Sequence, residues 1–111
     1  MPARLAGLQF VPGAEILFIG AGERLLAYRL GRFERLWEDT CDMGFLKWMQ
    51  HGKFVLMSAE LELAAWDSFG RKLWSTYAEP PWDYQVQEHR VQLDVMGIKS
   101  EFDLAKGPQH L

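Results

Sequence analysis

Two glutamates, Glu60 and Glu62, come closest in type and spacing to a catalytic arrangement in this chain. They alternate with Leu61 and Leu63, so an extended strand would place both carboxylates on one face. Paired carboxylates can perform acid/base or glycosidic chemistry when their separation is right. A solvated edge or turn is the more frequent reason for such a pair. If the pair is functional, we expect it to bind a carbohydrate or a metal. We assign no catalytic residue.

The histidines and the single cysteine do not form a recognisable site. His51 and His89 fall in equivalent turns, but the sequence brings no further ligands toward them, so no metal site is predicted. Cys41 is flanked by Asp39 and Asp42. Neighbouring carboxylates raise the pKa of a thiol and disfavour the nucleophilic thiolate, so we expect no catalytic cysteine.

The stretch YAEPPWDYQ, residues 77–85, is the most suggestive binding segment. Two prolines stiffen it, and Trp82 and Tyr84 offer large amphipathic surfaces at low entropic cost. The alternative is a linker between structural units in which Trp82 caps the core. The residues selected as binding candidates are Glu60, Glu62, Glu79, Trp82, Asp83 and Tyr84.

Composition narrows the classes of protein. The 111 residues suit one domain, 49% of them are hydrophobic, and the net charge is −3. The basic residues are scattered, which argues against a nucleic-acid partner. No apolar run reaches the roughly 20 residues that span a bilayer, and the N-terminal segment lacks a signal-peptide pattern. We expect a cytoplasmic protein with no membrane partner.

A repeat organises the chain. LAYRLGRFERLW, residues 26–37, is echoed by LAAWDSFGRKLW, residues 63–74, and a looser third copy begins at Val91. The aromatic residue inside each copy recurs at steps of 38 and 36 residues. Repeats of this length are typical of solenoids, propellers or other arrays.

Strands explain this repeat better than helices. A helical repeat is the alternative, because the apolar residues of 26–37 follow a helical stripe. Gly31 and Gly70 would interrupt such helices, whereas EILFIG, KFVLM and RVQLDV are short runs bounded by turn residues. Hairpins should close near residues 21–22, 59–61 and 97–98. The predicted strands are 5–10, 15–20, 24–30, 33–39, 43–50, 53–58, 62–67, 72–77, 82–87, 90–96 and 99–104.

These strands fall into groups of four, four and three. Tandem four-stranded antiparallel units are the blades of a β-propeller. We therefore predict an all-β domain of three blade-like units, about 1–42, 43–81 and 82–111, that stays open within one chain. A small β-sandwich is the alternative architecture.

One motif carries a family resemblance. SAELELAAWDSFGRKLW resembles the repeat of pyrroloquinoline-quinone-type propellers, in which a small residue, Asp, a Gly turn and Trp follow in order. Ala65, Asp67, Gly70 and Trp74 match that order, and AAWD is also similar to the end of a WD-repeat strand. The first copy keeps Trp37 and lacks the Asp.

The third copy keeps Asp103 and Gly107 and has no Trp after them. The resemblance implies that the recurring aromatic residues, Trp37 and Trp74 among them, are buried packing residues. Quinoprotein dehydrogenases bind their quinone in a channel lined by several blades, with calcium and an acidic base. This chain supplies neither a complete ring nor a matched ligand set, so no cofactor is expected.

The predicted function is a non-catalytic interaction or scaffold module that associates with itself through blade faces. Runs such as LQFV and FLKWM would form the exposed end faces, and two chains would supply about six blades, enough to close a ring. A homodimer is the expected partner arrangement, with an unidentified protein or small ligand as a further partner. The alternative is a ligand- or metal-binding relative of the quinoprotein-type enzymes.

The blade topology also predicts two rims of opposite charge. One rim would carry acidic residues and the other basic residues, and such faces steer partners through long-range fields. The acidic set is Glu23, Asp39, Asp42, Glu60, Glu79 and Asp83, and the basic set is Arg32, His51, Arg71, Lys72, His89 and Lys106.

Overall fold

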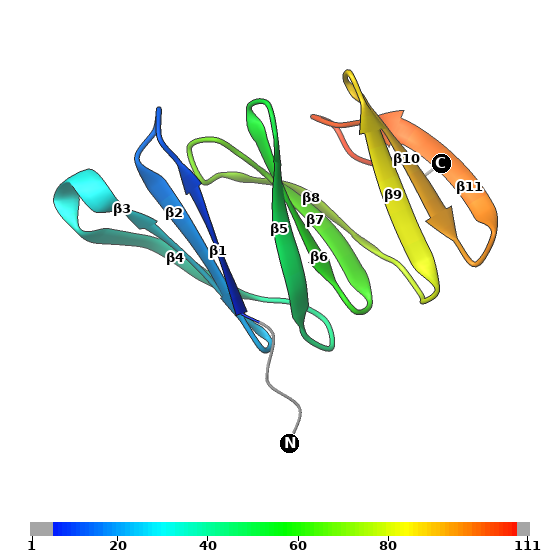
Figure 1. The fold of residues 1–111 in the computed structure, drawn as a ribbon, viewed down its shortest axis with the longest axis horizontal. Helices are drawn as coiled ribbons and strands as arrows, with labels where there is room; N and C mark the ends of the chain where they lie inside the picture. Colours follow the sequence, from blue (N-terminus) through cyan, green and yellow to red (C-terminus); the bar gives the residue numbers. More distant parts are fainter. Residues whose placement is uncertain (1–5, 109–111) are drawn as a thin grey trace.

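Three antiparallel sheets make up the computed structural model, which describes residues 6–108 (Figure 1). We call them blade 1, blade 2 and blade 3 in chain order. Blade 1 contains β1 (Ala6–Val11), β2 (Ile16–Ala21), β3 (Arg24–Arg29) and β4 (Glu34–Thr40). Blade 2 contains β5 (Phe45–His51), β6 (Phe54–Ala59), β7 (Glu62–Asp67) and β8 (Lys72–Tyr77). Blade 3 contains β9 (Trp82–Gln87), β10 (Arg90–Val95) and β11 (Ile98–Asp103).

The prediction of an all-β fold is confirmed, and each predicted strand overlaps an observed one. The predicted strand 5–10 starts at a residue outside the described range. The turns at 22–23, 60–61 and 96–97 lie at the predicted hairpins. The helical alternative for residues 26–37 is wrong, because a single 3₁₀ turn, η1 (Leu30–Arg32), separates β3 from β4. Phe33 closes this turn at φ 51°, a left-handed conformation that a continuous helix excludes.

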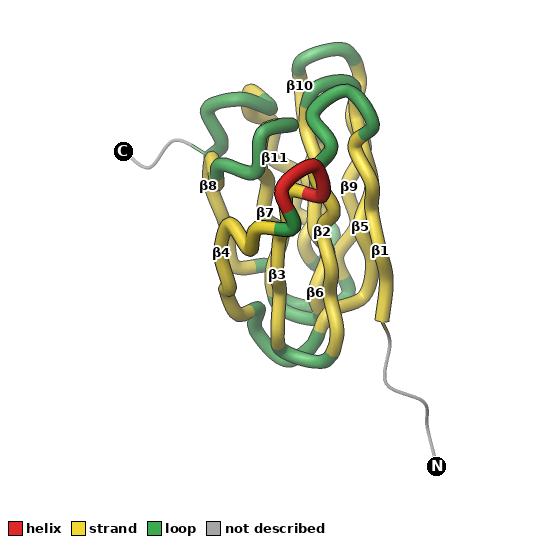
Figure 2. The backbone as a smooth tube through the Cα atoms, turned by 90° about the vertical axis from the view of Figure 1, so that its left-hand side faces the viewer, coloured by secondary structure: helices red, strands yellow, loops and turns green. Residues whose placement is uncertain are grey.

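The blades stand side by side as an open fan, which is the arrangement of an incomplete β-propeller (Figure 1). Turned by 90°, the first strand of each blade lies along one side of the molecule, and β4 and β8 lie along the other (Figure 2). Blades 1 and 3 each therefore have one face toward blade 2 and one face, here called the outer face, at an end of the fan. Among the described residues, no helix has the length and apolarity needed to cross a membrane.

Aromatic side chains fill the junction between blades 1 and 2. Phe18 from β2 lies 5.2 Å from Trp48, measured between ring centroids, and Trp37 stacks on Trp66 at 5.3 Å and 14°. Offset-stacked and edge-to-face pairs of this kind stabilise a core beyond the area they bury. The junction between blades 2 and 3 is more aliphatic, with Trp74 against Phe102 at its edge. Its buried members are Leu56, Leu63, Ala65, Trp74, Val91, Leu93, Phe102 and Leu104.

The repeated Trp and Gly are two halves of one contact. The indole N–H of Trp37 donates a hydrogen bond to the carbonyl oxygen of Gly70 in the next blade. The ring of Trp74 packs directly on Gly107, where a Cβ would collide with the indole. Each glycine has a positive φ, 85° and 79°, so the backbone also favours glycine there. Trp74 is 8% exposed, as predicted, whereas Trp37 is only partly buried.

Candidate functional site

Four of the six predicted binding residues meet at a groove between blades 2 and 3. Glu60, Trp82, Asp83 and Tyr84 line a hollow of about 430 Å³ that is walled on one side by Pro80 and Pro81 and also lined by Leu46, Lys47 and Ser58. A second hollow of about 510 Å³ shares Lys47, Asp83 and Tyr84 with it and extends along β5 and β9. Together they form one open channel beside these two strands, which we call the β5–β9 groove.

Trp82 and Tyr84 tie the two blades together at this groove. The indole N–H of Trp82 donates a 3.0 Å hydrogen bond to the carbonyl oxygen of Glu60. The two rings are stacked at 6.4 Å and 24°. Trp82 therefore caps the core between the two blades, as the linker alternative predicted. Part of its side chain still lines the groove.

Tyr84 and His51 form a polar contact across the groove. The Tyr84 hydroxyl lies 3.3 Å from Nε2 of His51. Burial, with a smaller contribution from Asp83, raises the pKa of Tyr84 to about 12. Burial also lowers the pKa of His51 below its usual 6.5. Both groups are thus neutral near pH 7, and the contact is a neutral hydrogen bond.

Glu60 and Glu62 do not act as a pair. Glu60 lies in the turn before β7 and is exposed, whereas Glu62 begins that strand and is 8% exposed. Glu62 accepts a 3.0 Å hydrogen bond from the backbone N–H of Asp42, and burial raises its pKa above 4.5. Strand alternation does not apply across the turn, so the expected shared face is wrong. Glu79 is exposed and does not line the β5–β9 groove.

Cys41 is buried close to Glu62. Its pKa is raised to about 11, first by burial and then by the charge of Glu62, with smaller contributions from Glu23 and Asp42. The predicted direction was right, although burial is the larger cause. Within residues 6–108, no group of three or more His, Cys, Asp and Glu side chains is placed to hold a metal ion.

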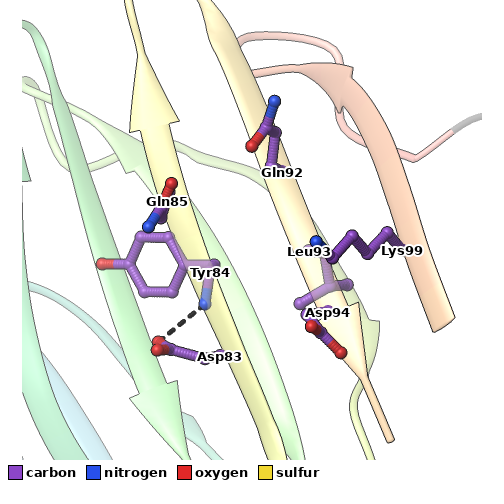
Figure 3. Close-up of a pocket in the computed structure, with 7 residues that line it drawn as sticks. All are labelled: Asp83, Tyr84, Gln85, Gln92, Leu93, Asp94 and Lys99. Atoms are coloured by element: carbon purple, nitrogen blue, oxygen red, sulfur yellow. Dashed lines mark hydrogen bonds between the residues drawn. The ribbon is translucent and has the colours of Figure 1, made fainter. Parts of the chain in front are cut away.

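The outer face of blade 3 is polar throughout. Alternation turns Val91, Leu93 and Phe102 toward blade 2, and the opposite positions of β9, β10 and β11 face away from it. A shallow pocket of about 160 Å³ opens on this face (Figure 3). The outward positions are Asp83, Gln85, Gln87, Arg90, Gln92, Asp94, Lys99, Glu101 and Asp103.

The outer face of blade 1 has the opposite character. Ile16, Phe18, Leu25 and Ala27 point into the junction with blade 2, so the alternate residues point away from it. Leu8 is 68% exposed on this face. The outward positions of its first three strands are Ala6, Leu8, Phe10, Leu17, Ile19, Ala21, Arg24, Leu26 and Tyr28.

Sequence reasoning identified one end face correctly and the other incorrectly. Leu8 and Phe10, from LQFV, lie on the outer face of blade 1. FLKWM forms β5 in the middle blade, where Phe45 and Trp48 are buried against blade 1. The alternation of polar residues along β9–β11 was the available signal for the polar end face.

The two predicted charged rims are bridged by an ion pair. Lys72, assigned to the basic rim, lies 2.9 Å from the Asp39 carboxylate of the acidic rim. Lys72 also lies over the Trp66 ring at 5.5 Å. β4 packs beside the start of β8 and brings these positions together, so each charge partly cancels the field of the other.

The fold and its faces define an open set of three propeller blades with one apolar and one polar end. No protein-family model and no curated protein matches the chain. Among solved structures, BamB from Moraxella catarrhalis is similar at 14% identity and a TM-score of 0.47, over 74% of this chain and 26% of that one. Hsv2 from Kluyveromyces lactis is similar at 13% identity and a TM-score of 0.45, over 92% of this chain and 34% of that one. The chain thus spans about a third or less of either structure.

Proposed function

We propose that this chain is a non-catalytic interaction module that associates with itself through the outer face of blade 1. The observation that carries the proposal is the apolar character of that face. Leu8 and Phe10 are exposed there at 68% and 42%, and Leu17, Ile19 and Leu26 lie beside them on β2 and β3. Leu17, Ile19 and Leu26 are partly exposed.

The size of the face gives a driving force for association. The apolar part of the face covers β1, β2 and β3, since the outward positions of β4 include Arg35 and Glu38. Three strands spaced by about 4.8 Å, each six residues long at about 3.4 Å per residue, span about 300 Å². At about 25 cal/mol per Å², covering two such areas contributes about 15 kcal/mol before the costs of association, which are about 4–15 kcal/mol. Apolar patches of a few hundred Å² are often functional.

Sedimentation velocity over protein concentrations from 1 to 200 μM tests the proposal. We expect a monomer–dimer equilibrium for the parent chain. Leu8→Glu should give a monomer throughout, because it places a charge in the covered face. Ile98→Glu is the matched control, since Ile98 is 76% exposed on β11 and should leave the equilibrium unchanged. A parent chain that stays monomeric over the whole range would refute self-association.

Ligand addition separates this proposal from the enzyme-like alternative. A ligand that binds the folded state raises its melting temperature. We expect no shift with calcium or with pyrroloquinoline quinone. A rise with either would favour a relative of the quinoprotein-type enzymes.

A further inference from the structure

We infer that the dimer is isologous: the outer face of blade 1 packs against the same face of a second copy, and the outer face of blade 3 stays open to solvent. This inference rests on the proposed self-association and adds its geometry. It also replaces the six-bladed ring predicted from the sequence, since such a ring would pack blade 1 of each chain against blade 3 of the other.

The polar outer face of blade 3 is a poor partner for blade 1. Across the sheet its rows read Asp83–Asp94–Lys99, Gln85–Gln92–Glu101 and Gln87–Arg90–Asp103. Burying polar or charged groups against an apolar surface is costly unless each finds a hydrogen-bond partner. Arg90, Gln92 and Glu101 hydrogen-bond to one another within this face. Ring closure would still take their charges out of water, and the apolar side chains of β1 and β2 offer no new partner in return.

The outer face of blade 1 is suited to packing against itself. Its two central rows read Leu8–Ile19–Leu26 and Phe10–Leu17–Tyr28. Facing sheets in a β-sandwich interdigitate such side chains at a separation of about 10 Å. A two-fold axis through this face brings apolar rows from both copies together and removes the exposed apolar surface from water.

The charges at the edge of this face oppose self-packing only weakly. Glu38 on β4 lies 3.1 Å from Arg24 and 3.4 Å from Arg35, so each copy carries both signs in a paired arrangement. Two arginines and one glutamate leave a net charge of +1 at this edge of each copy, and solvent screens the remaining repulsion because all three side chains are exposed.

The area predicts a weak contact. With β4 included, each face covers about 400 Å², so two faces bury about 800 Å², below the roughly 1,200 Å² at which stable interfaces begin. We expect dissociation in the micromolar range. The β5–β9 groove lies between blades 2 and 3, away from this contact, so each dimer would keep two free grooves.

Single-cysteine cross-linking tests the geometry. In a Cys41→Ser background, Ile19→Cys places one thiol at the centre of the blade 1 face, and Gln92→Cys places one at the centre of the blade 3 face. A bismaleimide with a span of about 10 Å, comparable to the spacing of packed sheets, should cross-link Ile19→Cys to itself. Gln92→Cys should stay uncross-linked, both alone and mixed with a size-tagged Ile19→Cys chain.

The outcomes separate the two proposals. Mixed Ile19→Cys and Gln92→Cys products would show ring closure and overturn the isologous contact while leaving self-association intact. Cross-linking of Gln92→Cys only to itself would show that the outer faces of blade 3 meet, and would also overturn the isologous blade 1 contact. Sedimentation of the Ile19→Cys and Gln92→Cys variants without cross-linker shows whether each still dimerises. A parent chain that never dimerises would refute the underlying self-association.

Discussion

Trp74 packs against Gly107, which follows it by 33 residues, and its indole N–H donates a 2.7 Å hydrogen bond to the nearby carbonyl oxygen of Leu104. Trp37 contacts Gly70, also 33 residues further on, but there the indole N–H donates its hydrogen bond to the carbonyl oxygen of the glycine itself. The recurrence of Trp and Gly in the sequence is therefore a recurrence of the contact that holds each blade to the next. Predictions about stability begin with this contact.

Removing the Trp74 side chain should destabilise the fold strongly. We expect Trp74→Ala to lower the free energy of unfolding by about 3–5 kcal/mol, because it leaves a cavity between blades 2 and 3. Trp74→Phe should cost less, since a ring remains and the hydrogen bond to Leu104 is worth about 1 kcal/mol. Urea unfolding followed by circular dichroism measures both. An unfolding midpoint for Trp74→Ala equal to that of the parent would contradict the packing role.

Glycine substitutions should separate backbone strain from side-chain collision. Gly97→Ala and Gly107→Ala place a Cβ at similar positive φ values, 87° and 79°. At Gly97 the new Cβ meets nothing within 4 Å, whereas at Gly107 it collides with Trp74. We expect a loss of about 1–2 kcal/mol for Gly97→Ala and a further 1–3 kcal/mol for Gly107→Ala. Equal losses in thermal unfolding would show that the Trp–Gly contact does not require glycine.

Ionisation of Glu62 should cost stability as the pH rises. Burial raises its pKa above 4.5 in the folded state, so the folded chain binds this proton more tightly than the unfolded chain. The contribution of protonated Glu62 to the free energy of unfolding is therefore present at low pH and is lost as the pH rises above about 4.5. Glu62→Gln, whose amide oxygen can still accept from the N–H of Asp42, should gain stability relative to the parent between about pH 4 and pH 7.

The comparison of Glu62→Gln with the parent isolates this residue from other titrating groups. Asp39, which is paired with Lys72, has a lowered pKa. Its contribution to stability therefore falls as the pH is lowered, opposite to that of Glu62, and it is present in both chains. Urea unfolding at several pH values gives the difference directly. A difference that does not change with pH would mean that Glu62 is solvated.

Cys41 should be inert while the chain is folded. The thiol is buried and its pKa is about 11, so little thiolate is present at pH 8. We expect iodoacetamide to modify the native chain far more slowly than the urea-unfolded chain, as measured by mass spectrometry. Rapid modification of the native chain would show that the junction between blades 1 and 2 opens readily.

The strands could be predicted from the sequence because each is a short apolar run with its own turn residues. The Trp and Gly positions could also be found from the sequence, because they recur in the aligned copies. Alternation states which side chains share a face, but it does not state what covers that face. The outer face of blade 1, with Leu17 and Ile19, reads in sequence like a face buried between blades.

The candidate site was predictable to the extent that it is local. Trp82, Asp83 and Tyr84 are consecutive residues of β9 and reach the β5–β9 groove together. Glu62 was misplaced because its surroundings come from Asp42, 20 residues away on another segment. His51 was placed in a turn with no partner identified, and its contact with Tyr84 depends on how blade 3 sits against blade 2.

The order of strands in space has a kinetic consequence. Within residues 6–108, each pairing joins strands that are consecutive in the chain, so every hairpin closes over a short loop. Short loops cost little closure entropy, and folding can begin in any blade and propagate to its neighbour, as in other repeat proteins. A nascent chain could thus complete blade 1 before blade 3 is synthesised. The apolar end face would then form first, exposed to other copies while the rest of the chain is still unfolded.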